Sequence, residues 1–170
     1  MKILGIIGGM SPESTATYYT EINRLVNQKK GGNISAPIVM VSVEFEEIVQ
    51  CQKQSEWQRA GEILAEAGKK LEMIGAEGIV LATNTMHKVA PQIERALSIP
   101  FLHILDATAD AIKSRGLNKV ALLGTKFTMS DNFYRDGLIV RGITPIVPNE
   151  SAQNEIHRII FDELCVGKFL

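Results

Sequence analysis

Residues 2–15 read KILGIIGGMSPEST, and this stretch determines the fold class of the N-terminal part of the chain. Its apolar run has the length of one buried strand, and the Gly8-Gly9 pair that follows predicts a tight turn. Ser11 is a favourable helix N-cap, Pro12 suits the first helical position, and Glu13 complements the positive end of a helix. The stretch therefore predicts a strand, a turn and a helix in immediate succession.

The same alternation of strand patterns and helix patterns continues along the rest of the sequence. Expected strands cover residues 2–7, 37–43, 78–82, 101–104, 120–123 and 144–147, and expected helices cover residues 11–28, 46–53, 57–74, 91–97, 107–115, 132–140 and 154–164. Strands that alternate with helices favour an α/β fold, in which helices cover both faces of a doubly wound parallel sheet.

Hydrophobic spacing predicts which parts of these elements are buried. Thr15, Tyr19, Ile22 and Val26 recur at 4-3-4 spacing, so the first helix is expected to bury one stripe. Residues 37–43 are too continuously apolar for a sheet with one wet face. Ser55 begins a capping-box pattern, and His103 is expected in the core because it lies in an apolar strand. The expected core of the first lobe consists of Ile3, Ile6, Ile38, Val39, Val41, Trp57, Leu64, Leu71, Ile79 and Val80.

Composition excludes several classes of protein. The 170 residues include 18 Lys plus Arg and 19 Asp plus Glu, and a net charge of −1 gives no electrostatic footprint for nucleic acid or an anionic membrane. No apolar run approaches the ~20 residues that span a bilayer, and the first run lacks the length and cleavage site of a signal peptide. Cys51 and Cys165 are too far apart in sequence for a CxxC motif, which excludes a disulfide scaffold and a cysteine-type zinc site. We expect a cytoplasmic protein.

A short internal sequence repeat suggests two lobes. Residues 119–130 repeat the pattern of residues 2–11, because a lysine opens an apolar strand, a glycine turn ends it and a Met-Ser pair precedes a helix. Either duplication of an ancestral unit or the sequence pattern common to all strand-turn-helix units explains this similarity. We expect a first α/β lobe over residues 1–105 and an incomplete second lobe over residues 106–170, which has no counterpart of residues 78–85. An unpaired sheet edge there predicts association as a homodimer.

Three polar turns follow expected strands, at residues 8–11, 83–87 and 124–128. Ligands of doubly wound sheets bind beyond the carboxyl ends of the strands, and hydroxyls with backbone N–H groups suit a small carboxylate or phosphate. Ordinary turn chemistry explains any one of these turns equally well. The sequence contains neither a complete GxGxxG fingerprint nor a P-loop.

The sequence leaves more than one role open for the histidines. His87 lies four residues after Thr83, where it is either a general acid or base or a surface or capping residue. His157 is expected to be exposed because its neighbours are charged. None of the histidines has the spacing of a metal-binding motif, so no metal is expected.

Three segments, residues 8–15, 82–87 and 164–169, together resemble the aspartate/glutamate racemase family in sequence, order and spacing. The resemblance implies two similar α/β lobes with the active site in the cleft between them. It also implies catalysis without pyridoxal phosphate or metal, by two residues, usually cysteines, that face opposite sides of the substrate α-carbon. A racemase needs such a pair because it exchanges a proton on both faces.

Carried over by position, the resemblance assigns Thr83 to the first catalytic place. The residues that it assigns to binding a small acidic amino acid are Met10, Gln52, Asn84, Thr85, Thr125 and Lys168. Met10 matches a turn that binds carboxylate through its backbone, and Lys168 matches a basic partner of the acidic substrate. The implied function is racemisation of aspartate or glutamate.

Two departures from the family pattern affect this expectation. Thr83 stands where the family usually has cysteine, and an aliphatic alcohol is a far weaker acid than a thiol of pKa ~8.5. The family's second catalytic cysteine follows a further helix and strand, and Cys165 does not match it. We therefore expect this chain by itself to racemise little or not at all. A non-catalytic carboxylate-binding module is the alternative, and a hydantoin racemase or maleate isomerase relative is another.

Overall fold

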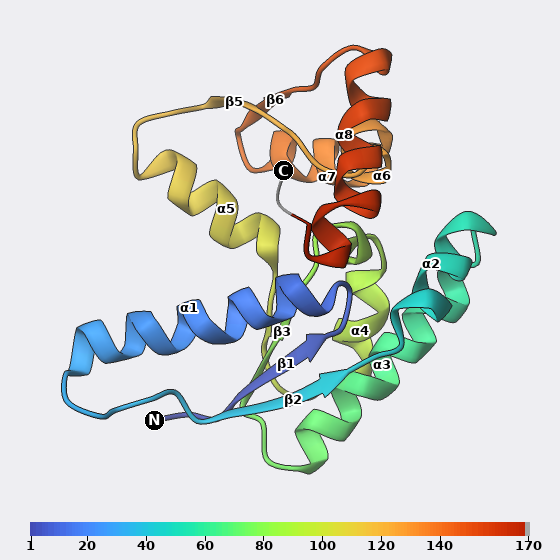
Figure 1. Ribbon diagram of the computed structural model, residues 1–170. Coiled ribbons are helices and arrows are strands. Elements are labelled where there is room, and N and C mark those ends of the chain that lie inside the picture. Colours follow the sequence, from blue (N-terminus) through green and yellow to red (C-terminus); the bar gives the residue numbers. More distant parts are fainter. Residues whose placement is uncertain (169–170) are drawn as a thin grey trace. The chain divides into compact units, whose positions relative to one another are not determined.

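The computed structural model describes residues 1–168 as an α/β protein that divides into two compact units (Figure 1). The first unit contains Met1–Thr83 and Val89–Leu102, and the second contains Asn84–Lys88 and the chain from His103 onward. The strands are β1 (Leu4–Gly8), β2 (Ile38–Ser42), β3 (Gly78–Leu81), β4 (Phe101–Leu102), β5 (Lys119–Ala121) and β6 (Thr144–Ile146). The helices are α1 (Pro12–Lys30), α2 (Phe45–Lys53), α3 (Trp57–Met73), α4 (Ala90–Ala96), α5 (Ile104–Lys113), α6 (Lys126–Ser130), α7 (Asn132–Val140) and α8 (Glu150–Asp162), with 3-10 turns η1 (Thr85–Val89) and η2 (Leu164–Val166).

The first unit is a four-stranded parallel sheet in the order β2-β1-β3-β4. The connection from β1 to β2 runs toward one edge of the sheet, and the connections from β2 to β3 and from β3 to β4 run toward the other. Because such crossovers are right-handed, α1 lies on one face while α3 and α4 pack together on the opposite face (Figure 1). The predicted α/β class with a parallel sheet is therefore confirmed.

The core of the first unit lies between the central strands and α3. Ile6 and Ile79 come from the neighbouring strands β1 and β3, and Leu64 and Leu71 lie on the inner face of α3. All four side chains are fully buried, as the hydrophobic spacing predicted. The other expected core residues, Ile3, Ile38, Val39, Val41, Trp57 and Val80, are only partly buried.

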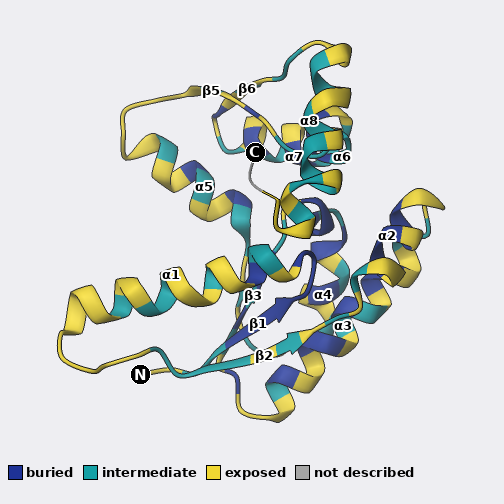
Figure 2. Ribbon diagram, in the orientation of Figure 1, coloured by how far each residue is buried: buried dark blue, intermediate teal, exposed yellow. Residues whose placement is uncertain are grey.

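Two burial predictions are wrong, and strand order and helix length explain both (Figure 2). The strand β2 is an edge strand with no buried residue, and Met40 in it is exposed. Helix α1 buries only Thr15, and Tyr19 is 51% exposed. A helix of 19 residues is about 28 Å long, whereas the five-residue strand β1 is about 17 Å long, so about 11 Å of α1 extends past the strand.

The second unit has a smaller sheet, in which β5 pairs with β6 in parallel. Its hydrophobic core consists of Leu105, Ala109, Leu122, Tyr134, Leu138 and Ile143. Leu123 and Ile146 are exposed, and α8 has no buried residue. The expected homodimer stays a prediction. No helix within residues 1–168 is both long and apolar enough to cross a membrane.

Local chemistry differs from prediction at three helix starts. Ser55 adopts a positive φ of 58°, and Glu56 is the N-cap of α3 without a side-chain bond, so the expected capping box is absent. His103 is not a core strand residue, because it is the N-cap of α5 and its Nδ1 accepts a hydrogen bond from the Leu105 N–H. The last helix begins after the N-cap Asn149, earlier than expected, since the Asn149 side chain accepts from the Ala152 N–H.

Candidate functional site

The turn after β1 is held by glycine and threonine packed in direct contact. The Oγ1 of Thr15 accepts a hydrogen bond of 2.8 Å from the Gly9 N–H and donates one of 2.8 Å to the Ser11 carbonyl. A Cβ on Gly8 would lie 2.3 Å from the Thr15 side chain, and a Cβ on Gly9 would lie 2.4 Å from the Val43 carbonyl oxygen. Gly9 also has a φ of 95°, a conformation that favours glycine. Only glycine fits at both positions.

The same turn lies beside the end of β3. Ser11 is buried and caps α1 by accepting from the Ser14 N–H, and the Ser14 hydroxyl donates to the Ala82 carbonyl at 3.4 Å. Met10, one of the expected substrate-binding residues, is buried in this turn. The carboxyl ends of β1 and β3 are thus joined through the first turn of α1, and Thr83, which is half-buried, follows Ala82 directly.

Helix α2 contributes the expected contact residue Gln52, which is 5% exposed. Its neighbour Cys51 is also buried, and burial raises the pKa of the Cys51 thiol above its ordinary value. A thiol that is harder to ionise is a poor nucleophile, which agrees with a structural role for Cys51.

Two expected site residues meet in the second unit. The hydroxyl of Thr85 in η1 lies 2.9 Å from that of Thr125, the N-cap of α6, although 40 residues separate them. The hydroxyl of Thr128 completes a triangle, at 3.3 Å from Thr85 and 3.2 Å from Thr125. Thr128 is 2% exposed and was not predicted. Its signal in the sequence was a second threonine three residues after an N-cap, where side chains lie on one face of a helix.

Asn84 has a buried partner that sequence reasoning also missed. The Tyr134 hydroxyl in α7 lies 3.2 Å from Asn84 Oδ1. Asn84 itself is exposed, whereas Tyr134 is 4% exposed and belongs to the core of the second unit. No local sequence pattern connects two residues 50 positions apart, so only the structure identifies this pair.

Two further polar groups of η1 have partners within the second unit. His87 is 2% exposed, and its Nε2 accepts a hydrogen bond of 3.2 Å from the Ile104 N–H at the start of α5. Of the roles considered for His87, the structure gives capping, though in the interior rather than on the surface. Lys88 forms an ion pair with Asp131. Burial by itself would raise the pKa of Asp131, but hydrogen bonds from Lys88 and the Phe133 N–H outweigh it and lower the pKa.

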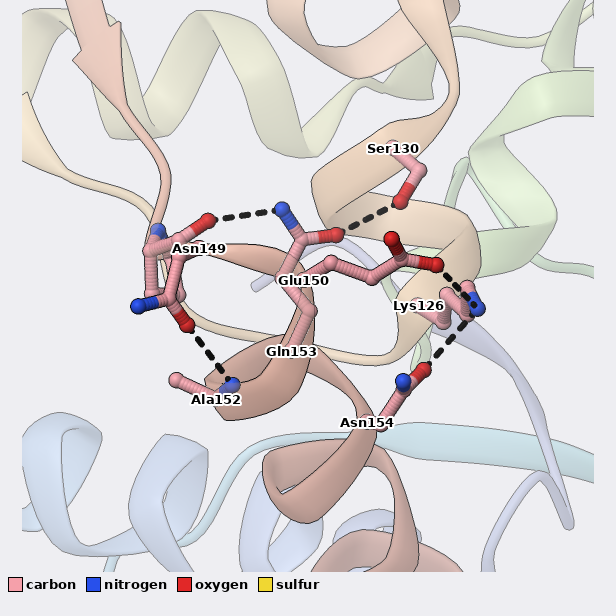
Figure 3. A network of polar contacts seen from close by, with 8 residues as sticks. Lys126, Ser130, Asn149, Glu150, Ala152, Gln153 and Asn154 are labelled. Carbon is pink, nitrogen blue, oxygen red and sulfur yellow. Dashed lines mark hydrogen bonds and ion pairs between the residues drawn. The ribbon is translucent and has the colours of Figure 1, made fainter.

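Helix α8 anchors the turn that carries Thr125 through a network of polar contacts (Figure 3). Lys126 donates from Nζ to Asn154, and Ser130 donates to Gln153 at 2.7 Å. The backbone N–H of Lys126 also donates to Nδ1 of His157. His157 is therefore partly buried rather than exposed as predicted, and burial together with the nearby Lys126 charge lowers the pKa of His157. This network holds the N-terminus of α6, and with it Thr125, in place.

Lys168 follows the 3-10 turn η2 in the second unit. It is exposed, and its backbone N–H donates to the Glu163 carbonyl. Within residues 1–168 no hydrogen bond or ion pair joins its side chain to another candidate residue. The same part of the chain contains no cluster of three or more His, Cys, Asp or Glu side chains that could hold a metal ion.

Known proteins share this arrangement of elements. The model of the Asp/Glu/hydantoin racemase family matches residues 7–168. A crystal structure of a candidate Asp/Glu racemase from Yersinia pestis is 50% identical, with a TM-score of 0.91 over 100% of this chain and 74% of that one. The structure of an aspartate racemase homologue from Pyrococcus horikoshii OT3 is 40% identical, with a TM-score of 0.83 over 99% of this chain and 74% of that one.

A curated relative supports the same grouping. The broad specificity amino-acid racemase RacX of Bacillus subtilis (strain 168) is 25% identical over 160 residues, which are 93% of this chain and 69% of that protein. Because the family model matches nearly the whole length and the solved structures match in fold and sequence, the resemblance inferred from the motifs is confirmed, and this chain belongs to the Asp/Glu/hydantoin racemase family.

Proposed function

We propose that this chain carries out the α-proton exchange of an amino-acid racemase on an acidic amino acid, aspartate or glutamate, that it inverts little of its substrate, and that it uses neither pyridoxal phosphate nor a metal. The observation that carries the proposal is the run Thr83-Asn84-Thr85 just after β3, in a chain that belongs to this family. The relatives named as an amino-acid racemase and an aspartate racemase homologue support the same class of reaction.

The hydroxyl and amide cluster of the second unit suits a carboxylate. Thr85 and Thr125 present hydroxyls 2.9 Å apart, and Asn84 adds an amide. When the α-proton leaves, the electron pair of the broken C–H bond moves onto the substrate carboxylate, and donors fixed in advance stabilise that charge. Met10, Gln52 and Lys168 are further binding residues of the proposal, by their positions in the family motifs.

Thr83 is the acid/base group that we assign. Racemisation breaks the α-C–H bond on one face and forms a new one on the other face, so it needs a group on each side. An alcohol is a much weaker acid than a thiol, so Thr83 stays protonated near neutral pH: it carries a proton that it can return to the carbanion, but it is a poor base for removing one. His87 does not assist as a base through Nε2, since that nitrogen accepts the Ile104 hydrogen bond.

Proton exchange in deuterated water tests the proposal. L- and D-forms of aspartate and glutamate are incubated with the chain, the loss of the α-proton signal is followed by NMR, and chirality is measured by chromatography. The variant Thr83→Val removes the hydroxyl and keeps the shape, and Thr144→Val, at an exposed position in β6, is the matched control. Because Thr83 is a weak base, we expect slow exchange by the parent and the control, and none by Thr83→Val.

The pattern of exchange and inversion separates the candidate functions. Inversion together with exchange supports a racemase with both acid/base groups, and exchange with little inversion supports one group, Thr83. Binding without exchange supports the alternative, a carboxylate-binding module, which the alcohol at position 83 favours. If neither amino acid binds and neither exchanges, the proposed function is wrong.

A further inference from the structure

The side chain of Tyr134 is packed among apolar residues, and its hydroxyl contacts an exposed polar side chain. Its ring is packed in the core of the second unit with Leu105 and Leu138, and it is 4% exposed. Its hydroxyl lies 3.2 Å from Oδ1 of Asn84, whose side chain is exposed. A phenylalanine ring would fill the same apolar space, so the hydroxyl serves a purpose other than packing.

We propose that Tyr134 is a positioning residue that orients the Asn84 amide toward an anionic ligand; the inference rests on the proposed function, because the ligand is the substrate carboxylate. The direction of the hydrogen bond follows from the groups. An amide oxygen only accepts, so the Tyr134 hydroxyl donates to Oδ1, and the Nδ2 of Asn84 must point away from Tyr134. Within residues 1–168 the structure gives that nitrogen no acceptor.

The backbone of Asn84 is fixed as well, which leaves side-chain rotation as the freedom that Tyr134 removes. The carbonyl of Asn84 accepts a hydrogen bond of 3.1 Å from the His87 N–H at the start of η1. An exposed asparagine without a side-chain partner samples several rotamers, and ordering it on ligand binding costs entropy. The bond from the core removes that cost in advance, so that both Nδ2 hydrogens face a carboxylate.

The variant Tyr134→Phe tests this inference, with Tyr19→Phe on the exposed face of α1 as the matched control. Loss of one neutral hydrogen bond predicts about two- to tenfold weaker binding of L-aspartate or L-glutamate. The expected kinetic effect is a higher KM for α-proton exchange with an unchanged kcat. Because phenylalanine retains the aromatic ring, the apolar core of the second unit stays filled. Thermal melting checks that the variant folds.

A double-mutant cycle shows whether Tyr134 acts through Asn84. In an Asn84→Ala background, Tyr134→Phe is expected to have no further effect on affinity. An equal loss in both backgrounds would mean a merely structural role for Tyr134 and would overturn the inference. Affinities are compared at a temperature at which thermal melting shows all four chains of the cycle to be folded, so that a loss of stability does not enter the comparison.

An NMR measurement separates this inference from the proposed function. The side-chain amide order parameter of Asn84 is expected to be high in the parent and in Tyr19→Phe, and to fall in Tyr134→Phe. An order parameter that does not change in Tyr134→Phe overturns the inference, whatever the chain binds. A parent chain that binds neither amino acid overturns the proposed function and the ligand assigned here, while the order parameter still decides whether Tyr134 positions Asn84.

Discussion

The substitution Gly8→Ala probes the stretch on which the first unit depends. A Cβ at this position would lie 2.3 Å from Cγ2 and 2.8 Å from Oγ1 of Thr15. Thr15 cannot rotate away without loss, because it is buried and its hydroxyl holds both the Gly9 N–H and the Ser11 carbonyl. Either the backbone of the turn shifts or these hydrogen bonds break.

The expected loss of stability follows from these contacts. Overpacking in a close-packed interior costs about 1–3 kcal/mol, and each of the two hydrogen bonds contributes about 1 kcal/mol. We therefore expect Gly8→Ala to destabilise the first unit by about 3 kcal/mol. For a chain of this length that corresponds to a fall in Tm of about 6–12 °C.

Fluorescence of Trp57 measures this transition, because it is the one tryptophan in the sequence and lies at the start of α3 in the first unit. The control is Gly78→Ala, where the added Cβ would meet only the Pro100 carbonyl at 3.6 Å, an ordinary contact. Its expected effect is within about 0.5 kcal/mol.

A rescue variant identifies the cause. Thr15→Ser removes Cγ2, which is the atom nearest to the added Cβ, and keeps the hydroxyl. Gly8→Ala with Thr15→Ser is expected to be more stable than Gly8→Ala alone. If Gly8→Ala melts with the parent chain, or if Thr15→Ser brings no recovery, the steric explanation is refuted.

Three further outcomes follow from the site. Thr83→Cys is expected to speed α-proton exchange or widen its stereochemical range, because a thiol ionises far more readily than an alcohol; a variant no faster than the parent with any enantiomer contradicts the role of Thr83. Because the pKa of His157 is lowered, its contribution to stability is full above the ordinary histidine value of about 6.5 and is lost as the pH falls through the lower folded pKa. The free energy of unfolding of the parent, measured by chemical denaturation, should therefore fall over that pH range. His157→Gln should make this pH dependence flatter. The lowered pKa of Asp131 likewise predicts stability that is full above the ordinary carboxyl value of about 3.9 and is lost as the pH falls through the folded pKa; Asp131→Asn should remove this acid-dependent part, and an unchanged acid profile would contradict it.

Local sequence chemistry determined most of the elements in the first unit. The strand, glycine turn and capped helix of residues 4–30 follow from interactions that reach only a few positions along the chain. The same holds for α3, whose buried positions Leu64 and Leu71 were visible in the helical spacing. The family was also visible in the sequence, because its motifs are short local stretches, two of which, residues 8–15 and 82–87, follow the strands β1 and β3.

The tertiary structure alone decided burial at the edges and the partners within the site. The apolar strand β2 is partly exposed because it pairs with one neighbour, and strand order depends on pairings distant in sequence. The hydroxyl contact of Thr85 with Thr125 and the bond from Tyr134 to Asn84 join residues 40 and 50 positions apart. Local patterns have a range of a few residues, whereas these contacts form only when strands and helices from different parts of the chain pack together.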